Sequence, residues 1–231
     1  AINGYAHFGN ALGASFGLPV VLPHGLMSFV EVLQANWSDY STWYEMLNLG
    51  FRITPTAGTD YPCVTNLPGH ERFYTRVEDP FTYNNWLEGV RKGRTFVTTG
   101  PLLEFSVNGK DIGDDVKLNK PGTVIVEGKA TFNPQTDNLL GLEIMENGEL
   151  VKSFSATDDS GVINFKFEHR VEKNSWLALR GRSGSLNNYW GEEIIDIAAY
   201  RDVTRAHSAP IYINIKGAPP LEEQARAKST A

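Results

Sequence analysis

The chain has 231 residues, of which 41% are hydrophobic and 21% charged, a composition typical of globular proteins with one large domain or two smaller ones. Its formal charge of −6 and its lack of a Lys and Arg cluster argue against binding to nucleic acid, and no apolar run approaches the ~20 residues that span a membrane. Cys63 is the single cysteine, which excludes an intrachain disulfide and leaves the cellular compartment undetermined.

Two early segments are predicted to be strands that each carry one ligand-type side chain. Residues 2–7 are expected to form a short buried strand ending in His7, and residues 28–34 are a near-continuous apolar run with Glu31 inside it. Such a run is typical of a strand covered on both faces. A carboxylate buried there is costly unless it is paired, hydrogen-bonded or bound to a metal.

The sequence next predicts a helix, a strand and an acidic turn. Apolar residues at helical spacing predict a helix over residues 40–49, and the strand-like run 50–60 ends in a turn that carries Asp60. Chemistry in α/β sheets lies at the carboxyl ends of strands. His7, Glu31 and Asp60 lie 24 and 29 residues apart in the chain, near the roughly 30 residues of a βαβ unit. We therefore expect three consecutive units, each offering one ligand-type side chain.

Beyond Asp60 the sequence predicts a loop followed by a strand, a helix and another strand. Residues 61–71 are rich in Pro and Gly and contain His70. The three elements that follow are predicted at residues 72–77, 81–92 and 95–99. The helix-strand rhythm ends there, so residues 1–99 form the predicted first domain.

From residue 100 onward, short β-like runs alternate with turns, and Asn-Gly pairs between apolar runs signal hairpins. This pattern predicts an immunoglobulin-like antiparallel β-sandwich over residues 100–217, followed by a tail at residues 218–231. The predicted strands cover residues 102–107, 123–132, 142–145, 150–154, 162–171, 175–180 and 209–215. The expected fold is thus a two-part α/β or α+β arrangement.

A series of motifs occurs in order along the first half of the chain. They are Gly4-Tyr5-Ala6-His7, Phe29-Val30-Glu31-Val32-Leu33, Trp43-Tyr44-Glu45-Met46-Leu47-Asn48-Leu49-Gly50-Phe51-Arg52, Thr56-Ala57-Gly58-Thr59-Asp60, Gly69-His70-Glu71-Arg72-Phe73-Tyr74, and the run from Trp86 to Pro101. As an ordered set they resemble the CehA/McbA group of metallohydrolases, a branch of the PHP (polymerase and histidinol phosphatase) superfamily. The similarity covers about residues 3–110.

The resemblance implies a distorted (β/α) barrel whose strand ends gather His, Asp and Glu around divalent metals. Zn, Mn or Fe would activate water for hydrolysis of a phosphoester, ester or related bond in a small-molecule substrate. His7 and Asp60 resemble metal ligands of the family, and Glu31 resembles an acid that the family keeps. His70 is a candidate replacement for a missing family histidine, and Arg72 is a candidate for binding an anionic substrate.

The chain also departs from the family pattern. It has no counterpart of the family's His-x-His strand or of its next motif, which ends in Asp-His, and Tyr61-Pro62 replaces the Ser-His that often follows the family's Gly-Ser-Asp acid. The resemblance therefore implies the C-terminal portion of a larger hydrolase, inactive or nearly so without its N-terminal half. Part of a barrel leaves a sheet edge exposed, through which a homo-oligomer is expected.

Two functions stay open at this point, because every candidate residue also has a structural interpretation. The alternatives are hydrogen bonding for His7, a turn or helix cap for Asp60, a pair with Arg52 for Glu31, a solvated loop for His70, and a pair with Glu71 or Glu45 for Arg72. The chain is either the hydrolase fragment or a non-catalytic module that binds carbohydrate or a protein partner, for which Trp176, Tyr189 and Trp190 are candidate aromatics. No P-loop, Rossmann glycine pattern, Gly-x-Ser-x-Gly or His-Glu-x-x-His motif competes.

Overall fold

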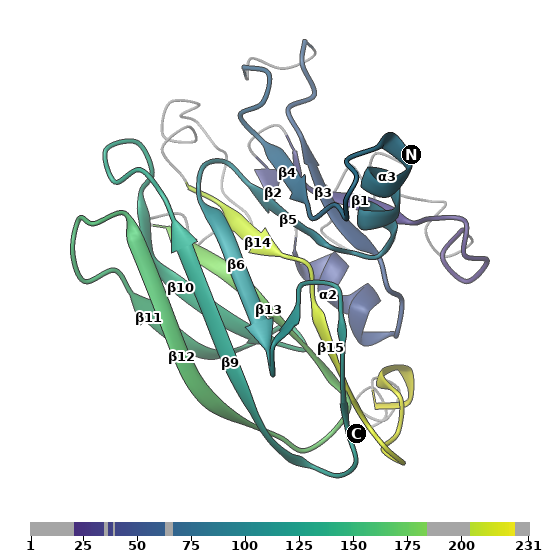
Figure 1. Ribbon diagram of the computed structural model, residues 1–231. Helices are drawn as coiled ribbons and strands as arrows, with labels where there is room; N and C mark the ends of the chain where they lie inside the picture. The colour runs from purple at the N-terminus through teal and green to yellow at the C-terminus, as the bar shows by residue number, and fades with distance from the viewer. Residues whose placement is uncertain (1–20, 35–36, 39, 63–66, 184–203, 225–231) are drawn as a thin grey trace, which may run out of the picture.

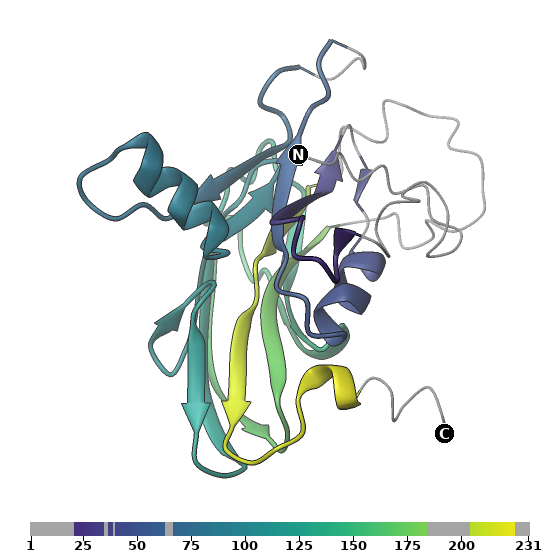
Figure 2. The ribbon, with the colours of Figure 1, turned by 90° about the vertical axis from the view of Figure 1, so that its right-hand side faces the viewer.

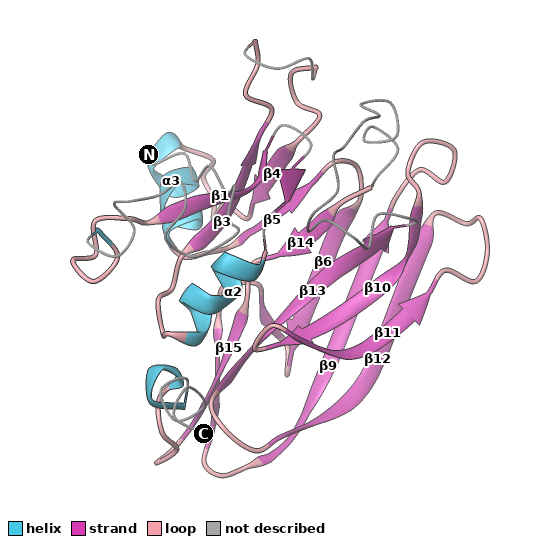
Figure 3. Ribbon diagram, turned by 180° about the vertical axis from the view of Figure 1, so that it is seen from behind, coloured by secondary structure: helices cyan, strands magenta, loops and turns pink. Residues whose placement is uncertain are grey.

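Most of the chain forms β-sheet. The computed structural model describes residues 21–34, 37–38, 40–62, 67–183 and 204–224. Figure 1 shows two sheets stacked as a β-sandwich, with the N-terminal elements gathered at one side. From behind, these N-terminal elements lie against the outer face of the larger sheet (Figure 3). The described part of the chain therefore has three layers.

The smaller sheet of the sandwich has four antiparallel strands in the order β12-β9-β6-β7. They are β6 (Leu102–Val107), β7 (Lys110–Asp111), β9 (Gly122–Thr131) and β12 (Val162–Val171). Alternate residues of β6 are buried, as expected for a strand with one face on the core and the other in solvent. Gly128 of β9 pairs with Phe165 of β12, whose ring fills the space that a Cβ of residue 128 would occupy. A side chain at residue 128 would therefore force the Phe165 ring to move.

The larger sheet has eight strands. Its main path runs β11-β10-β13-β14-β5-β4, while β15 pairs with β13 and, in parallel, with β8. The strands are β4 (Arg72–Thr75), β5 (Thr95–Thr98), β8 (Asp115–Leu118), β10 (Leu139–Glu146), β11 (Glu149–Ser155), β13 (Ser175–Ser183), β14 (Ala206–Ser208) and β15 (Ile211–Ile215). Pro210 separates β14 from β15, which pair with successive parts of β13. Proline has no N–H for a ladder, so the break falls there.

The third layer, here called the N-terminal layer, is built on one βαβ unit. In it β1 (Phe29–Gln34) and β3 (Thr54–Gly58) are parallel and are joined through α2 (Ser41–Asn48), with β2 (Trp37–Ser38) antiparallel to β1. A parallel pair needs such a crossover connection. The hydroxyl of Thr95 in β5 donates to the carbonyl of Pro55 at 2.9 Å. This bond ties β3 to the larger sheet.

Two hydrophobic cores meet at β13. Leu177 and Leu179 face the core between the two sheets, whereas Trp176 and Ala178 face the N-terminal layer. All four are fully buried, because β13 is covered on both faces. Continuous burial of Ser175–Leu179 is the pattern of such a doubly covered strand.

The predicted β-sandwich is confirmed, but the predicted partial (β/α) barrel is wrong. Within the described residues β1 and β3 are the single parallel pair joined by a helix. The strands β4 and β5 are antiparallel although α3 (Tyr83–Arg91) joins them, and β5 pairs with β14 of the sandwich. The two strands therefore extend the larger sheet instead of closing a barrel. Without a partial barrel, the described residues present no exposed barrel edge of the kind through which a homo-oligomer was expected.

The larger sheet crosses residue 99, since β4 and β5 precede that residue and the strands they join follow it. The domain boundary placed there stays a prediction. No helix in the described ranges is long and apolar enough to cross a membrane. In Figure 2, α3 stands away from the sandwich at the side of the molecule, next to the edge strand β4.

Candidate functional site

The βαβ unit brings Glu31 and Asp60 close enough to interact, as the sequence indicated. Glu31 lies in β1, Asp60 follows β3 by two residues, and the two strands run in parallel. Burial raises the pKa of Glu31, and the nearby charge of Asp60 raises it further. The Oε2 atom of Glu31 is buried without a hydrogen-bond partner among the described residues. Arg52, the alternative partner of Glu31, binds Asp115 instead.

The backbone after β3 is shaped around these acids. A Cβ at Gly58 would lie 2.5 Å from Oε1 of Glu31, so the carboxylate rests directly against the glycine. Asp60 has a φ of 54°, in the left-handed region, which Asp adopts more readily than most residues. The Gly-Thr-Asp turn thus positions one acid and leaves space for the other.

These two carboxylates fit only part of a metal site. The described residues contain no group of three or more His, Cys, Asp or Glu side chains that could hold a metal ion. Catalytic zinc, for comparison, commonly takes three protein ligands. His7, the third predicted ligand, lies outside the described residues. The divalent metal therefore stays a prediction.

The guanidinium group of Arg72 ties two loops together. Its Nε lies 3.2 Å from the hydroxyl of Tyr74. Its Nη atoms donate to four backbone carbonyls at 3.1–3.3 Å, those of Gly69, His70, Thr99 and Gly100. An anionic substrate would have to compete with these bonds.

His70 lies two residues before Arg72, the first residue of β4, and beside a buried acid. Its Nδ1 is 3.2 Å from Oε1 of Glu71, whose side chain is fully buried. The predicted roles of His70 in metal binding and of Arg72 in substrate binding stay predictions.

Sequence reasoning missed a surface that we call the aromatic strip, made of Phe73, Tyr83 and Trp86. The ring centroid of Trp86 lies 6.0 Å from that of Phe73 in β4 and 6.3 Å from that of Tyr83. Tyr83 is 72% exposed, and Phe73 and Trp86 are half-buried. The hydroxyl of Thr82 accepts a hydrogen bond from the Asn85 N–H at 3.1 Å and fixes the start of α3 next to Tyr83.

Trp176 is not a binding aromatic, because it is fully buried against the N-terminal layer. Tyr189 and Trp190 lie outside the described residues. The signal that could have revealed the aromatic strip is the run Tyr83-Asn84-Asn85-Trp86, in which two large rings flank two amides that suit a solvated surface.

Comparisons with known proteins do not identify a family for this chain. No protein-family model matches the chain, and no curated protein matches it. Among solved structures, the sulfur carrier protein SoxY from Chlorobium limicola f thiosulfatophilum is similar over 51% of this chain and 80% of its own, with 10% identity and a TM-score of 0.31. A likeness at that TM-score carries no argument about this chain.

Proposed function

We propose that this chain is a non-catalytic binding module that binds carbohydrate on the aromatic strip. The observation that carries the proposal is the 72% exposure of Tyr83 beside Trp86, on a helix that projects from the sandwich (Figure 2). Large aromatic side chains gathered on a surface mark binding sites more often than scattered exposure does.

The geometry of the strip suits a sugar ring. A pyranose presents a face of C–H groups that packs on an aromatic ring while its hydroxyls stay hydrogen-bonded at the edge. Tyr and Trp combine an apolar ring with a polar group for this purpose. The ring planes of Tyr83 and Trp86 differ by 27°, so their faces are nearly parallel.

Isothermal titration calorimetry with a panel of neutral oligosaccharides tests this proposal. We expect Trp86→Ala and Tyr83→Ala each to weaken binding roughly tenfold or more, which is about 1.4 kcal/mol. Tyr61→Ala is the matched control, because Tyr61 is 61% exposed but lies outside the strip. Binding that survives both strip variants, or no heat with any oligosaccharide, would reject carbohydrate recognition by this surface.

The pair of Glu31 and Asp60 favours a second candidate function. In this proposal the two carboxylates supply part of the ligand set of a metal-dependent hydrolytic site. A divalent ion bound there would supply activated water for hydrolysis. The unpartnered Oε2 of Glu31 and the raised pKa of that carboxyl support it, since a cation would satisfy the oxygen and favour the ionised form.

Metal analysis by mass spectrometry tests the second candidate on this chain and on the longest product of its reading frame, purified without chelator. A phosphoester and carboxyl-ester screen accompanies it. If the hydrolase proposal holds, the protein contains metal and turns over a substrate, and Glu31→Gln or Asp60→Asn lowers both. Absence of metal and turnover from both preparations would leave only the binding module.

A further inference from the structure

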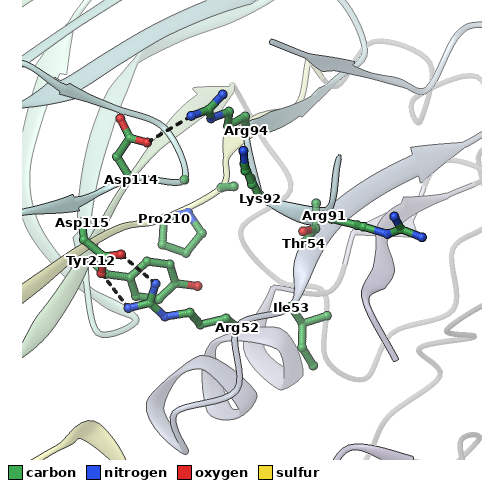
Figure 4. A pocket seen from close by; sticks show the side chains of 13 residues that line it. Arg52, Ile53, Thr54, Arg91, Lys92, Arg94, Asp114, Asp115, Pro210 and Tyr212 are labelled. Atoms are coloured by element: carbon green, nitrogen blue, oxygen red, sulfur yellow. Dashed lines mark hydrogen bonds and ion pairs between the residues drawn. The ribbon is translucent and has the colours of Figure 1, made fainter. Parts of the chain in front are cut away.

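We propose that a cavity between the N-terminal layer and the sandwich binds a small multivalent oxyanion, such as phosphate or a dicarboxylate. This seam pocket has a volume of about 360 Å³, within the usual range for small-molecule sites. Arg52, Lys92, Arg94, Asp114, Asp115 and Tyr212 are among the residues that line it (Figure 4). It is separate from both the aromatic strip and the Glu31 and Asp60 pair.

The charge of the lining favours an anion. Three cationic residues that extend into the pocket, Arg52, Lys92 and Arg94, stand against the two carboxylates of Asp114 and Asp115. This net positive lining occurs on a chain whose formal net charge is −6. A concave surface with a net charge of one sign concentrates ions of the other sign.

One wall of the pocket is formed by a compensated ion pair. Arg52 donates to both carboxylate oxygens of Asp115, at 3.0 and 2.6 Å, and its guanidinium lies 4.1 Å from the centroid of the Tyr212 ring. Asn214 also donates to Asp115, at 2.7 Å. The hydrogen bond from Arg52 lowers the pKa of Asp115, which therefore stays ionised and paired. The negative charge of Asp115 is thus already compensated when a ligand arrives.

The opposite wall carries the cations that a ligand recruits. Figure 4 shows Lys92 and Arg94 extending together from the segment after α3, across the pocket from Arg52. The Nζ atom of Lys92 is 3.4 Å from Glu88, a surface pair one helical turn apart in which the lysine side chain is 46% exposed. Such pairs are weak and easily exchanged.

Arg94 is held more firmly than Lys92. It lies 2.5 Å from Glu78 and 3.9 Å from Asp114. Lys92 is therefore the cation whose recruitment disturbs the protein least, and an oxyanion with more than one charge is needed to engage it together with the guanidinium groups. Arg91 points away from the cavity in Figure 4 and is given no role.

Thermal denaturation of the whole chain at constant ionic strength tests the proposal, with inorganic phosphate and succinate as probes. A ligand that binds only the folded state raises the melting temperature with concentration. We expect stabilisation by at least one probe and none by acetate, which carries a single charge. Lys92→Gln should weaken the apparent affinity roughly tenfold while leaving the melting temperature without ligand almost unchanged.

Lys129→Gln is the matched control, because Lys129 is also exposed and paired with a glutamate, at 2.8 Å, but lies in the smaller sheet. It should respond to the probes as the parent chain does, and so should Trp86→Ala, which separates this site from the aromatic strip. Equal responses of the parent chain and Lys92→Gln would overturn the proposal. So would stabilisation by spermidine in place of the anions, since the carboxylates would then dominate the pocket.

Discussion

The two faces of β13 contact their neighbours through different kinds of interaction. The core between the sheets is aliphatic and phenylalanine-rich, so non-directional packing holds it together. The interface with the N-terminal layer is aromatic and hydrogen-bonded. There the indole of Trp176 donates to Asn48 at 2.9 Å, and the amide of Asn48 donates to the carbonyl of Asn147 at 3.0 Å.

The same interface buries a histidine. His207 is fully buried, with Nδ1 2.8 Å from the carbonyl of Ser208 and Nε2 bound to the hydroxyl of Tyr44. Because the carbonyl only accepts, Nδ1 carries the proton and the Tyr44 hydroxyl donates to Nε2. The sandwich core thus needs only apolar surface of about the right shape, whereas the N-terminal layer must dock in one orientation.

The largest loss of stability should come from Trp176→Ala, which removes the main aromatic contact of β13 with the N-terminal layer. Removing a fully buried Trp costs about 3–5 kcal/mol. Trp176→Phe keeps most of the packing and loses the bond to Asn48, at about 1 kcal/mol. Urea denaturation followed by circular dichroism measures both. Leu177→Ala is the comparison on the other face of β13, and a loss below about 1 kcal/mol for Trp176→Ala would mean that the layer contributes little stability.

A pH dependence should follow from His207. Burial lowers its pKa to about 3 from an ordinary value of 6.5. Between these values the unfolded state binds a proton that the folded state does not, so the free energy of unfolding falls as the pH drops below 6.5. The loss from pH 6.5 to pH 5 should be about 2 kcal/mol. Denaturation curves at the two pH values measure it.

Two variants assign that pH dependence. His207→Gln should remove the histidine's share, whereas His24→Gln, at an exposed position, should leave the slope as it is. An unchanged slope in His207→Gln would show that other groups cause the acid sensitivity.

A smaller effect is expected at the acid pair. Gly58→Ala places a methyl group 2.5 Å from the present position of Glu31 Oε1, so the carboxylate must move, at a cost of about 1 kcal/mol. Combining it with Glu31→Ala should remove most of that cost, a coupling that a double-mutant cycle measures. Gly122→Ala is the control, because its Cβ would meet the nearest atom at 3.7 Å. Additive effects would mean that the carboxylate does not rest on Gly58.

The smallest effect should come from Asp115→Asn, which breaks the ion pair between Arg52 and the sandwich. The two side chains are 51% and 35% exposed, so the loss should stay below about 1 kcal/mol and shrink further in high salt. Glu104→Gln, which breaks the surface pair with Lys129, gives the reference. A loss of several kcal/mol would mean that the layer is held by charge as much as by its aromatic interface.

The sequence predicted much of the local structure. Strands were expected at residues 102–107 and 162–171, and β6 and β12 have these bounds. The short strands β8 and β14 were missed, because they carry almost no periodic signal. Strand β8 has four residues, among them the polar Asp115 and Lys117, and strand β14 has three residues, one of which is a histidine. Both are strands only because β13 and β15 offer them hydrogen-bonding edges.

The candidate sites divide in the same way. The approach of Glu31 and Asp60 was predictable, since both belong to one βαβ unit whose elements are close in sequence. The seam pocket was not, because it joins Arg52 to Asp115 and Tyr212, residues that are remote in the chain. No local sequence pattern predicts contacts between residues so far apart in the chain.

By itself the sequence determined where most of the longer strands and helices lie, that the second half of the chain forms a sandwich, and that an acid follows β3. Tertiary structure decided that β5 pairs with β14 and that α2 and its strands cover the sheet. The physical reason is that every strand offers the same backbone donors and acceptors. The local sequence therefore indicates a strand but does not specify which other strand it pairs with. The choice of neighbour depends on burying side chains from distant segments together, as Trp43, Trp176 and His207 are buried here.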